Sequence, residues 1–308
     1  MTETQHWDPS RLLAEGRVLS DRYQLGRVLG RGGMGEVYLA QDMVLNRQVA
    51  AKVFHSAETS PGDGKRRQLE AELLARLSHP GLVTVFDAGF DAEEHLGFLV
   101  MEFVEGPTLA ARLAGGPLLE GQVRQLGAAV AEALAYVHEH GVVHRDVKPG
   151  NVLFTDAEDY TRVKLADFGI ARLADSARLT TAGMIVGSAQ YLSPEQAKGE
   201  AVGPPSDVYG LGLVLLECVT GAPVFPGAGI EPVVARLHRD PPVPDDLEPA
   251  LGQLLTAMTG RDPAQRPTAQ HAATALGDDS ITAPLPRPPF VAVSDRDETT
   301  ALPPGIGT

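Results

Sequence analysis

The distribution of apolar residues changes sharply at residues 104–107, and this change constrains the fold more than any other feature. Before Val104, short runs rich in Val and Leu are separated by Gly and Asn, a pattern typical of strands joined by turns. After Pro107, apolar residues recur with a period of about 3.6, which predicts helices. We therefore predict an α+β fold in which a small strand-rich lobe precedes a larger helical lobe.

The same patterns predict the individual elements. In the first lobe, five strands are expected within 23–54, 83–90 and 96–104, and one helix over 66–77. In the second lobe, a long amphipathic helix is expected through 123–137, and weaker patterns predict helices over 247–258 and 268–276. The segment 207–219 is apolar nearly all round, so its helix should be buried in the centre of the second lobe.

The residues outside these elements set the expected boundaries. The first residues are polar and irregular, and the last stretch holds six prolines with a net charge of −3, a composition typical of a disordered acidic tail. We expect an N-terminal extension over 1–20, one domain over 21–277 with lobes at 21–103 and 107–277, and a Pro-rich acidic tail over 278–308.

Charge and cysteine content exclude several classes of protein. The chain has a net charge of −14, which disfavours broad binding to nucleic acid or to anionic membranes. Its single cysteine, Cys218, excludes a disulfide scaffold and is interpreted as a small core residue. The N-terminus lacks the apolar region of a signal peptide, and the best apolar run, 211–219, is too short to span a bilayer. A cytoplasmic location is therefore expected.

The first chemical motif is the glycine-rich run from Gly30 to Val37, which fits G-x-G-x-x-G-x-V. Glycines let backbone N–H groups approach a phosphate chain closely. In dinucleotide-binding folds a helix follows such glycines, whereas here residues 36–39 have the composition of a strand. The run predicts a hairpin over phosphates, although a Gly-rich surface turn has the same appearance.

The second motif is a lysine on a predicted strand. In alternating geometry, Lys52 shares a face with Ala50, so a small side chain leaves room for a flat base while the ammonium reaches phosphates. Glu70 lies on the inward stripe of the predicted helix with Leu74 and Leu77. A carboxylate that faces a core needs a cation, and Lys52 is the natural partner.

The third and fourth motifs supply acids and amides. The loop 144–151, HRDVKPGN, offers the Asp146 carboxylate, the Lys148 ammonium and the Asn151 amide between a predicted helix and a predicted strand. Such a loop suits a base, a phosphate contact and a metal ligand, although a charged turn is the simpler alternative. Downstream, Asp167 precedes Phe168 and Gly169 and offers hard oxygen ligands for Mg²⁺.

Taken together and in this order, the motifs resemble those of eukaryotic-like (Hanks-type) protein kinases, specifically the bacterial serine/threonine branch. The resemblance covers about residues 20–277. It is strengthened by His79-Pro80, Ser193-Pro194-Glu195, the run 207–212, Arg261-Asp262-Pro263 with Arg266, and the run GSAQYLSPEQAKG at 187–199. It implies a bilobal protein-kinase-like fold, with a five-stranded antiparallel sheet and one helix in the first lobe and a mainly helical second lobe.

The resemblance also implies roles in the transfer of the ATP γ-phosphate to Ser or Thr hydroxyls of proteins. Asp146 would accept or orient the hydroxyl proton, and Lys148, whose position matches the Ser/Thr pattern, would contact the γ-phosphate. Lys52, oriented by Glu70, would hold the α- and β-phosphates. Mg²⁺ or Mn²⁺ would bind Asn151 and Asp167. The remaining ATP contacts would be Leu29, Gly30, Gly32, Gly33, Gly35, Val37, Ala50, Met101 as gatekeeper, the backbone of Glu102 and Val104, and Leu153.

Supporting and regulatory residues follow from the same resemblance. Glu195 and Arg266 match a buried ion pair, and Asp207 would brace the catalytic loop. Arg145 beside the catalytic aspartate predicts activation by phosphorylation of the loop that follows Asp167. The candidate phosphosites are Thr180 and Thr181 in that loop, and Thr299 and Thr300 in the tail.

The implied partners are protein substrates, a forkhead-associated-domain protein that binds the phosphorylated loop or tail, and a second copy in a transient homodimer for trans-autophosphorylation. Two alternatives remain. A pseudokinase scaffold is disfavoured because Lys52, Glu70, Asp146, Asn151 and Asp167 are all present. A small-molecule phosphotransferase of related fold is disfavoured by the Ser-Pro-Glu segment and the loop before it.

Overall fold

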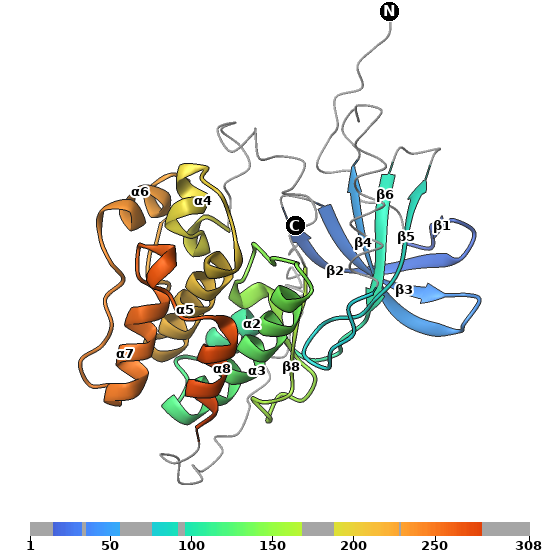
Figure 1. Ribbon diagram of the computed structural model, residues 1–308. Helices are drawn as coiled ribbons and strands as arrows, with labels where there is room; N and C mark the ends of the chain where they lie inside the picture. Colours follow the sequence, from blue (N-terminus) through green and yellow to red (C-terminus); the bar gives the residue numbers. More distant parts are fainter. Residues whose placement is uncertain are drawn as a thin grey trace, which may run out of the picture.

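The computed structural model describes residues 15–32, 35–55, 76–91, 96–167, 188–227 and 229–278. These residues form two lobes, with a sheet in one and a group of helices in the other (Figure 1). The α+β fold expected from the sequence is confirmed. The predicted helix over 66–77 lies almost wholly outside the described residues.

The first lobe is an antiparallel sheet in the order β1-β2-β3-β4-β6-β5. Its strands alternate faces, so Tyr38, Val49 and Ala51 enter one apolar cluster while Ala50 and Lys52 face the other way, as predicted. The strands are β1 (Val18–Leu19), β2 (Tyr23–Gly32), β3 (Gly35–Asp42), β4 (Arg47–His55), β5 (Val85–Asp91) and β6 (Leu96–Glu102).

The sheet has six strands, where the sequence pattern predicted five. The additional strand, β1, lies within the stretch expected to be an irregular extension. Ser20 and Asp21 have φ values of 47° and 53°, and this left-handed turn folds Leu19 back onto Tyr23. Leu19 is fully buried. A two-residue strand is too short to show alternation, which is why the pattern missed it.

The second lobe is mainly helical. Helix α5 lies at its centre, and Ser206 to Cys218 are all buried, as its apolar sequence predicted. Helix α3 presents its apolar face to α5 and α8. The elements are α2 (Leu109–Leu113), α3 (Glu120–Glu139), η1 (Pro149–Asn151), β7 (Val152–Phe154), β8 (Val163–Leu165), η3 (Ser188–Tyr191), α4 (Pro194–Lys198), α5 (Pro204–Thr220), α6 (Glu231–His238), α7 (Pro249–Met258), η4 (Pro263–Gln265) and α8 (Ala269–Gly277).

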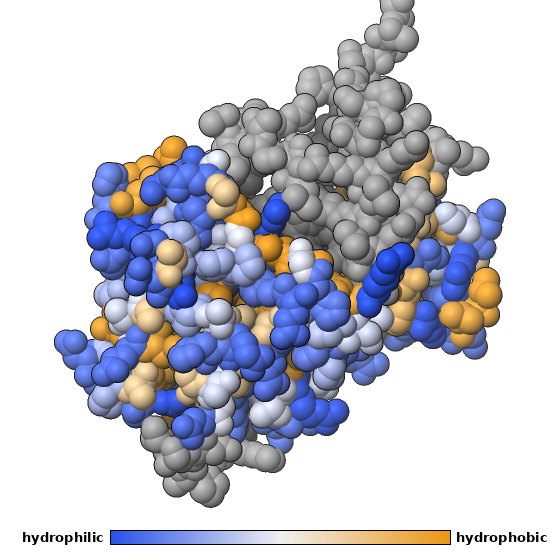
Figure 2. All heavy atoms as spheres, viewed as in Figure 1, coloured by the Kyte–Doolittle hydropathy of each residue, from blue (hydrophilic) through white to orange (hydrophobic). Residues whose placement is uncertain are grey.

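The surface of the second lobe agrees with this inward packing. The face seen in Figure 2 is mainly hydrophilic, with apolar patches between the charged groups. Within the ranges that the structure describes, no helix combines the length and the apolar character needed to cross a bilayer.

Backbone hydrogen bonds to β8 join the two lobes. Leu82 bridges Leu165 of β8 in parallel, and the Val83 N–H donates to the Leu165 carbonyl at 3.0 Å. The Leu165 N–H in turn donates to the Gly81 carbonyl at 2.8 Å. A segment that precedes the last two strands of the first lobe is therefore hydrogen-bonded to the β7–β8 hairpin of the second.

Candidate active site

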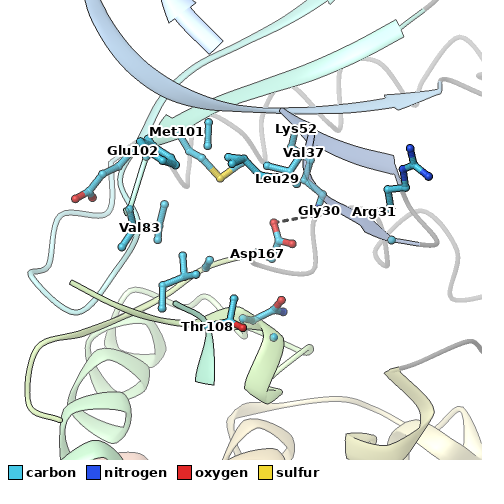
Figure 3. A pocket seen from close by; sticks show the side chains of 18 of the residues that line it. Leu29, Gly30, Arg31, Val37, Lys52, Val83, Met101, Glu102, Thr108 and Asp167 are labelled. Carbon is cyan, nitrogen blue, oxygen red and sulfur yellow. Dashed lines mark ion pairs between the residues drawn. The ribbon is translucent and has the colours of Figure 1, made fainter. Parts of the chain in front are cut away.

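A cleft of about 540 Å³ lies between the lobes (Figure 3). Strands β2, β3 and β4 line it from the first lobe, and η1, β7 and the residues after β8 line it from the second. Of the predicted site residues it contains Leu29, Gly30, Gly32, Gly35, Val37, Ala50, Lys52, Met101, Glu102, Val104, Asp146, Lys148, Asn151, Leu153 and Asp167. Motifs far apart in the sequence thus meet in one cavity.

One end of the cleft is apolar. Ala50 and Met101 belong to a buried cluster against which Leu29, Val37 and Leu153, predicted as ATP contacts, pack. Val83 and Ala166 are in the same cluster and line the cleft, although the sequence motifs did not include them. Such a flat, apolar slot between two lobes suits a planar base.

The predicted backbone contacts, Glu102 and Val104, also line the cleft. The Glu102 N–H donates to the Thr84 carbonyl at 2.8 Å, so a ligand would have to use the Glu102 carbonyl. The Glu102 side chain turns away from the cavity (Figure 3) and forms an ion pair with Lys164 at 2.8 Å. Val104 lines the cleft beyond the end of β6.

The glycine-rich run includes the end of β2 and the start of β3, where Gly32 is paired to Gly35. Gly33 lies outside the described residues, while Gly30, Gly32 and Gly35 line the cleft. Gly35 has a φ of 141°, and a Cβ there would overlap the Val53 carbonyl oxygen. Only glycine fits this close approach of β3 to β4.

We expect Gly35→Ala to destabilise the nucleotide-free protein by about 1–3 kcal/mol, because the backbone of β3 or β4 must shift. Gly30→Ala is the matched control: a Cβ there meets nothing within 4 Å. Thermal unfolding of both variants without nucleotide checks the prediction. Equal melting temperatures for the two variants would contradict it.

Lys52 and Asp167 form an ion pair across the cleft. Lys52 Nζ lies 2.8 Å from Asp167 Oδ1, and both side chains are partly buried. Asp167 has a φ of 61°, a left-handed conformation uncommon outside glycine. The predicted partner of Lys52, Glu70, lies outside the described residues, so that pairing stays a prediction.

The loop 144–151 brings three groups together. Lys148 Nζ donates to Asp146 Oδ2 at 2.7 Å. Asn151 Nδ2 donates to the Asp146 carbonyl at 2.8 Å and to Asp146 Oδ2 at 3.1 Å. The Asp146 carboxylate is only 15 % exposed. Two donors thus hold one carboxylate oxygen and fix the direction in which the carboxylate faces the cleft.

The central helix braces this loop, as predicted. Asp207 of α5 accepts the N–H of His144 at 2.7 Å and that of Arg145 at 2.6 Å. Its carboxylate also lies 2.8 Å from His138 Nε2. Arg145 has a φ of 67°, so the two backbone hydrogen bonds to Asp207 help to hold a left-handed residue beside Asp146.

His144 joins the two acidic motifs. Burial lowers the pKa of its imidazole, which favours the neutral form. The Asp146 N–H donates to His144 Nδ1 at 3.3 Å, so the proton is on Nε2, which donates to the Ala166 carbonyl at 2.9 Å. The neutral ring therefore sets the spacing between Asp146 and the residue before Asp167.

The cleft also offers ligands for a divalent cation. Because the Asn151 amide nitrogen points at Asp146, its oxygen points the other way. Asp167 uses Oδ1 for Lys52, which leaves Oδ2 as a second hard oxygen. Mg²⁺ usually takes one or two protein oxygens and completes its shell with phosphate oxygens and water, so these residues fit it.

Beyond the cleft, Glu195 and Arg266 form the buried ion pair that the sequence implied. Arg266 Nη1 and Nη2 donate to the two carboxylate oxygens at 2.7 and 2.9 Å, and Ser206 donates to Oε1 at 2.6 Å. Burial alone would raise the pKa of Glu195, but these hydrogen bonds outweigh it and lower the pKa.

The predicted sites Thr180, Thr181, Thr299 and Thr300, together with Phe168 and Gly169, lie outside the described residues.

Comparison with known proteins places this geometry in context. The family model described as "Protein kinase domain" matches residues 23–275. The chain is 38% identical over 299 residues to serine/threonine-protein kinase PknB of Mycobacterium leprae, with 94% of this chain and 47% of that protein covered. It is 41% identical over 258 residues to PknA of Mycobacterium tuberculosis, with 82% and 59% covered.

A solved structure is similar as well. The PknI kinase domain of Mycobacterium tuberculosis superposes with a TM-score of 0.67 at 30% sequence identity. The match covers 86% of this chain and 98% of that domain. The chain spans less than half of the PknB relative and 59% of the PknA relative.

Proposed function

The chain belongs to the protein kinase domain family, and from that premise we propose that it is a serine/threonine protein kinase. It transfers the γ-phosphate of ATP to Ser and Thr hydroxyls of protein substrates and of its own chain. The observation that carries this proposal is the convergence of Asp146, Lys148 and Asn151 with the Lys52–Asp167 pair in one cleft.

Each residue has a role that its position supports. Asp146 orients the substrate hydroxyl and takes up its proton, and Lys148, which is held against the same carboxylate, contacts the γ-phosphate. Lys52 holds the α- and β-phosphates of the nucleotide. Mg²⁺, or Mn²⁺ in its place, would be held by Asn151 and Asp167 and would neutralise phosphate charge. The adenine occupies the apolar slot beside Met101 and the backbone of Glu102 and Val104.

An assay with γ-labelled ATP and Mg²⁺ tests the proposal against its alternatives. We expect label on protein Ser and Thr residues, and loss of labelling when EDTA removes the cation. No label despite ATP binding would identify a pseudokinase scaffold. Label on a small molecule alone would identify a phosphotransferase of another class. Adding Mg²⁺ or Mn²⁺ back after EDTA determines which cation is used.

We also propose that phosphorylation of Thr180 or Thr181 activates the enzyme. A phosphate would add nearly two negative charges for Arg145 to pair with and would order the loop. The Thr180→Ala/Thr181→Ala double variant is expected to lose most activity, and Thr299→Ala/Thr300→Ala serves as the matched control in the tail. Full activity of the loop double variant would contradict the proposal. Mass spectrometry after autophosphorylation identifies the modified residues.

The partners and the location are part of the same proposal. A forkhead-associated-domain protein would bind the phosphorylated loop or tail, because such domains use arginine clusters to bind phosphate. A transient homodimer would let one copy phosphorylate the loop of another. We place the reaction in the cytoplasm, where ATP is supplied and where a chain with one cysteine stays reduced.

A further inference from the structure

Helix α6 carries an arginine that the proposed chemistry does not use. Arg236 is fully buried, with no exposed side-chain surface. Its Nε donates to the Pro232 carbonyl at 2.9 Å, its Nη1 donates to the Leu192 carbonyl, and its Nη2 donates to the Ala189 carbonyl. The guanidinium therefore joins α6 to a segment more than 40 residues earlier in the chain.

The burial of this cation is costly. None of the ion pairs among the described residues includes Arg236, and burial lowers the pKa of its guanidinium to about 10, which still leaves it charged at neutral pH. Carbonyl oxygens and the face of the Phe225 ring, 5.1 Å away, surround the charge. A methionine would fill the same space without this cost, so packing alone does not account for an arginine here.

The two carbonyls that Arg236 holds lie within η3 and directly after it. Ala189 lies inside this single turn, and Leu192 follows it directly. The next helix begins at Pro194, and Gln196 Nε2 on it donates to the Arg145 carbonyl at 2.9 Å. The segment is thus tied to α6 on one side and to the catalytic loop on the other.

The segment also lies beside the catalytic aspartate. A Cβ built on Gly210 of α5 would lie 3.2 Å from the Val147 Cβ and 3.6 Å from the Tyr191 carbonyl oxygen. Val147 directly follows Asp146, so η3 and the catalytic loop rest on the same turn of α5. A shift of η3 would change the surface that a bound polypeptide meets next to the reacting hydroxyl.

We propose that Arg236 is a positioning residue that fixes the segment 188–192 as the floor on which a protein substrate lies. This inference rests on the proposed kinase function. The planar fork of a guanidinium sets the distance between two carbonyls, which the single ammonium of a lysine does not do. Arg236 acts through the backbone of this segment and contacts neither the nucleotide cleft nor the reacting atoms.

The test is steady-state kinetics with a Ser/Thr peptide substrate. Arg236→Met is expected to raise the KM for the peptide by about 10-fold, in keeping with the loss of a hydrogen bond to a charged group. The KM for ATP and peptide-independent ATP hydrolysis should stay at the wild-type values. Arg236→Lys should also raise the peptide KM, because it keeps the charge but loses the fork.

Arg124→Met is the matched control. Arg124 is also a buried arginine of the second lobe that bonds a backbone carbonyl, that of Ala275, but it lies away from η3. The Arg124→Met variant should leave the peptide KM unchanged. An equal rise for Arg124→Met, or an unchanged peptide KM for a folded Arg236→Met, overturns the inference.

Tyr191→Phe is a second variant, which serves if Arg236→Met does not fold. Tyr191 Oη donates to Glu217 of α5 at 2.6 Å and so anchors η3 independently. Loss of this hydrogen bond in Tyr191→Phe should also raise the peptide KM without changing the KM for ATP. An unchanged peptide KM overturns the inference. If the wild-type protein transfers no phosphate, the proposed function and this inference are overturned together. If the wild-type protein transfers phosphate normally but the variants keep the wild-type peptide KM, only the inference about Arg236 is overturned.

Discussion

Asp146→Asn is expected to lower the rate of phosphoryl transfer by about 10²–10⁴-fold. The carboxylate is held by Lys148 and Asn151 in the cleft, and an amide of the same shape keeps most of these contacts. What it loses is the ability to take up the hydroxyl proton. The measurement is initial-rate transfer from γ-labelled ATP to a Ser/Thr peptide, with ATP affinity and melting temperature determined in parallel.

Asp156→Asn provides the control for this prediction. Asp156 lies in the turn of the β7–β8 hairpin, where its side chain is 45% exposed and outside the cleft. The same chemical change there should leave the rate unaltered. If Asp146→Asn keeps a rate in the usual kinase range of about 1–100 s⁻¹, Asp146 is not the base.

Glu195→Gln is expected to reduce the free energy of unfolding by about 3 kcal/mol, because it leaves Arg266 charged and buried without its carboxylate. For a domain of this size such a loss corresponds to a fall in Tm of about 10 °C. Thermal unfolding followed by calorimetry or circular dichroism measures it.

The chain contains a matched pair at the surface. Arg261 and Asp240 also lie 2.7 Å apart, but their side chains are 51% and 61% exposed, whereas those of Arg266 and Glu195 are 0% and 3% exposed. Asp240→Asn should therefore cost only about 0–1 kcal/mol. Similar melting temperatures for the two variants would show that burial of the pair does not matter.

The pH dependence of the buried pair has a definite sign. The pKa of Glu195 is lowered in the folded protein, below the ordinary value of 4.5. The stability that the pair contributes is therefore fully present above about pH 4.5 and is lost as the pH falls through the lower, folded value. The difference in stability between the wild-type protein and Glu195→Gln should shrink in acid.

Much of the cleft could be predicted from the sequence because its residues occur in motifs whose spacing fixes their chemistry. Lys52 and Ala50 share a face because a strand alternates, and Asp207 braces the loop from a helix whose apolar sequence placed it at the centre. In both cases a local pattern determines the three-dimensional outcome.

Other features depend on contacts that leave no local pattern. Val83 and Ala166 are ordinary small apolar residues, and only the junction of the lobes brings them to the cleft. Arg236 lies in a short run with His238 and Arg239 that has the composition of a solvated helix end. Its burial depends on η3 packing over α6, a contact between distant parts of the chain.

The hydrogen bonds between residues 81–83 and β8 have a consequence for dissecting the protein. Cutting the chain at residues 104–107 would separate the lobes by sequence, but it would also remove the strand-like segment that pairs with Leu165. The backbone N–H and carbonyl of Leu165 would then lose their hydrogen-bond partners. Leu165 lies two residues before Asp167. We therefore expect that neither lobe, expressed alone, keeps the backbone hydrogen bonds that lead to the catalytic centre.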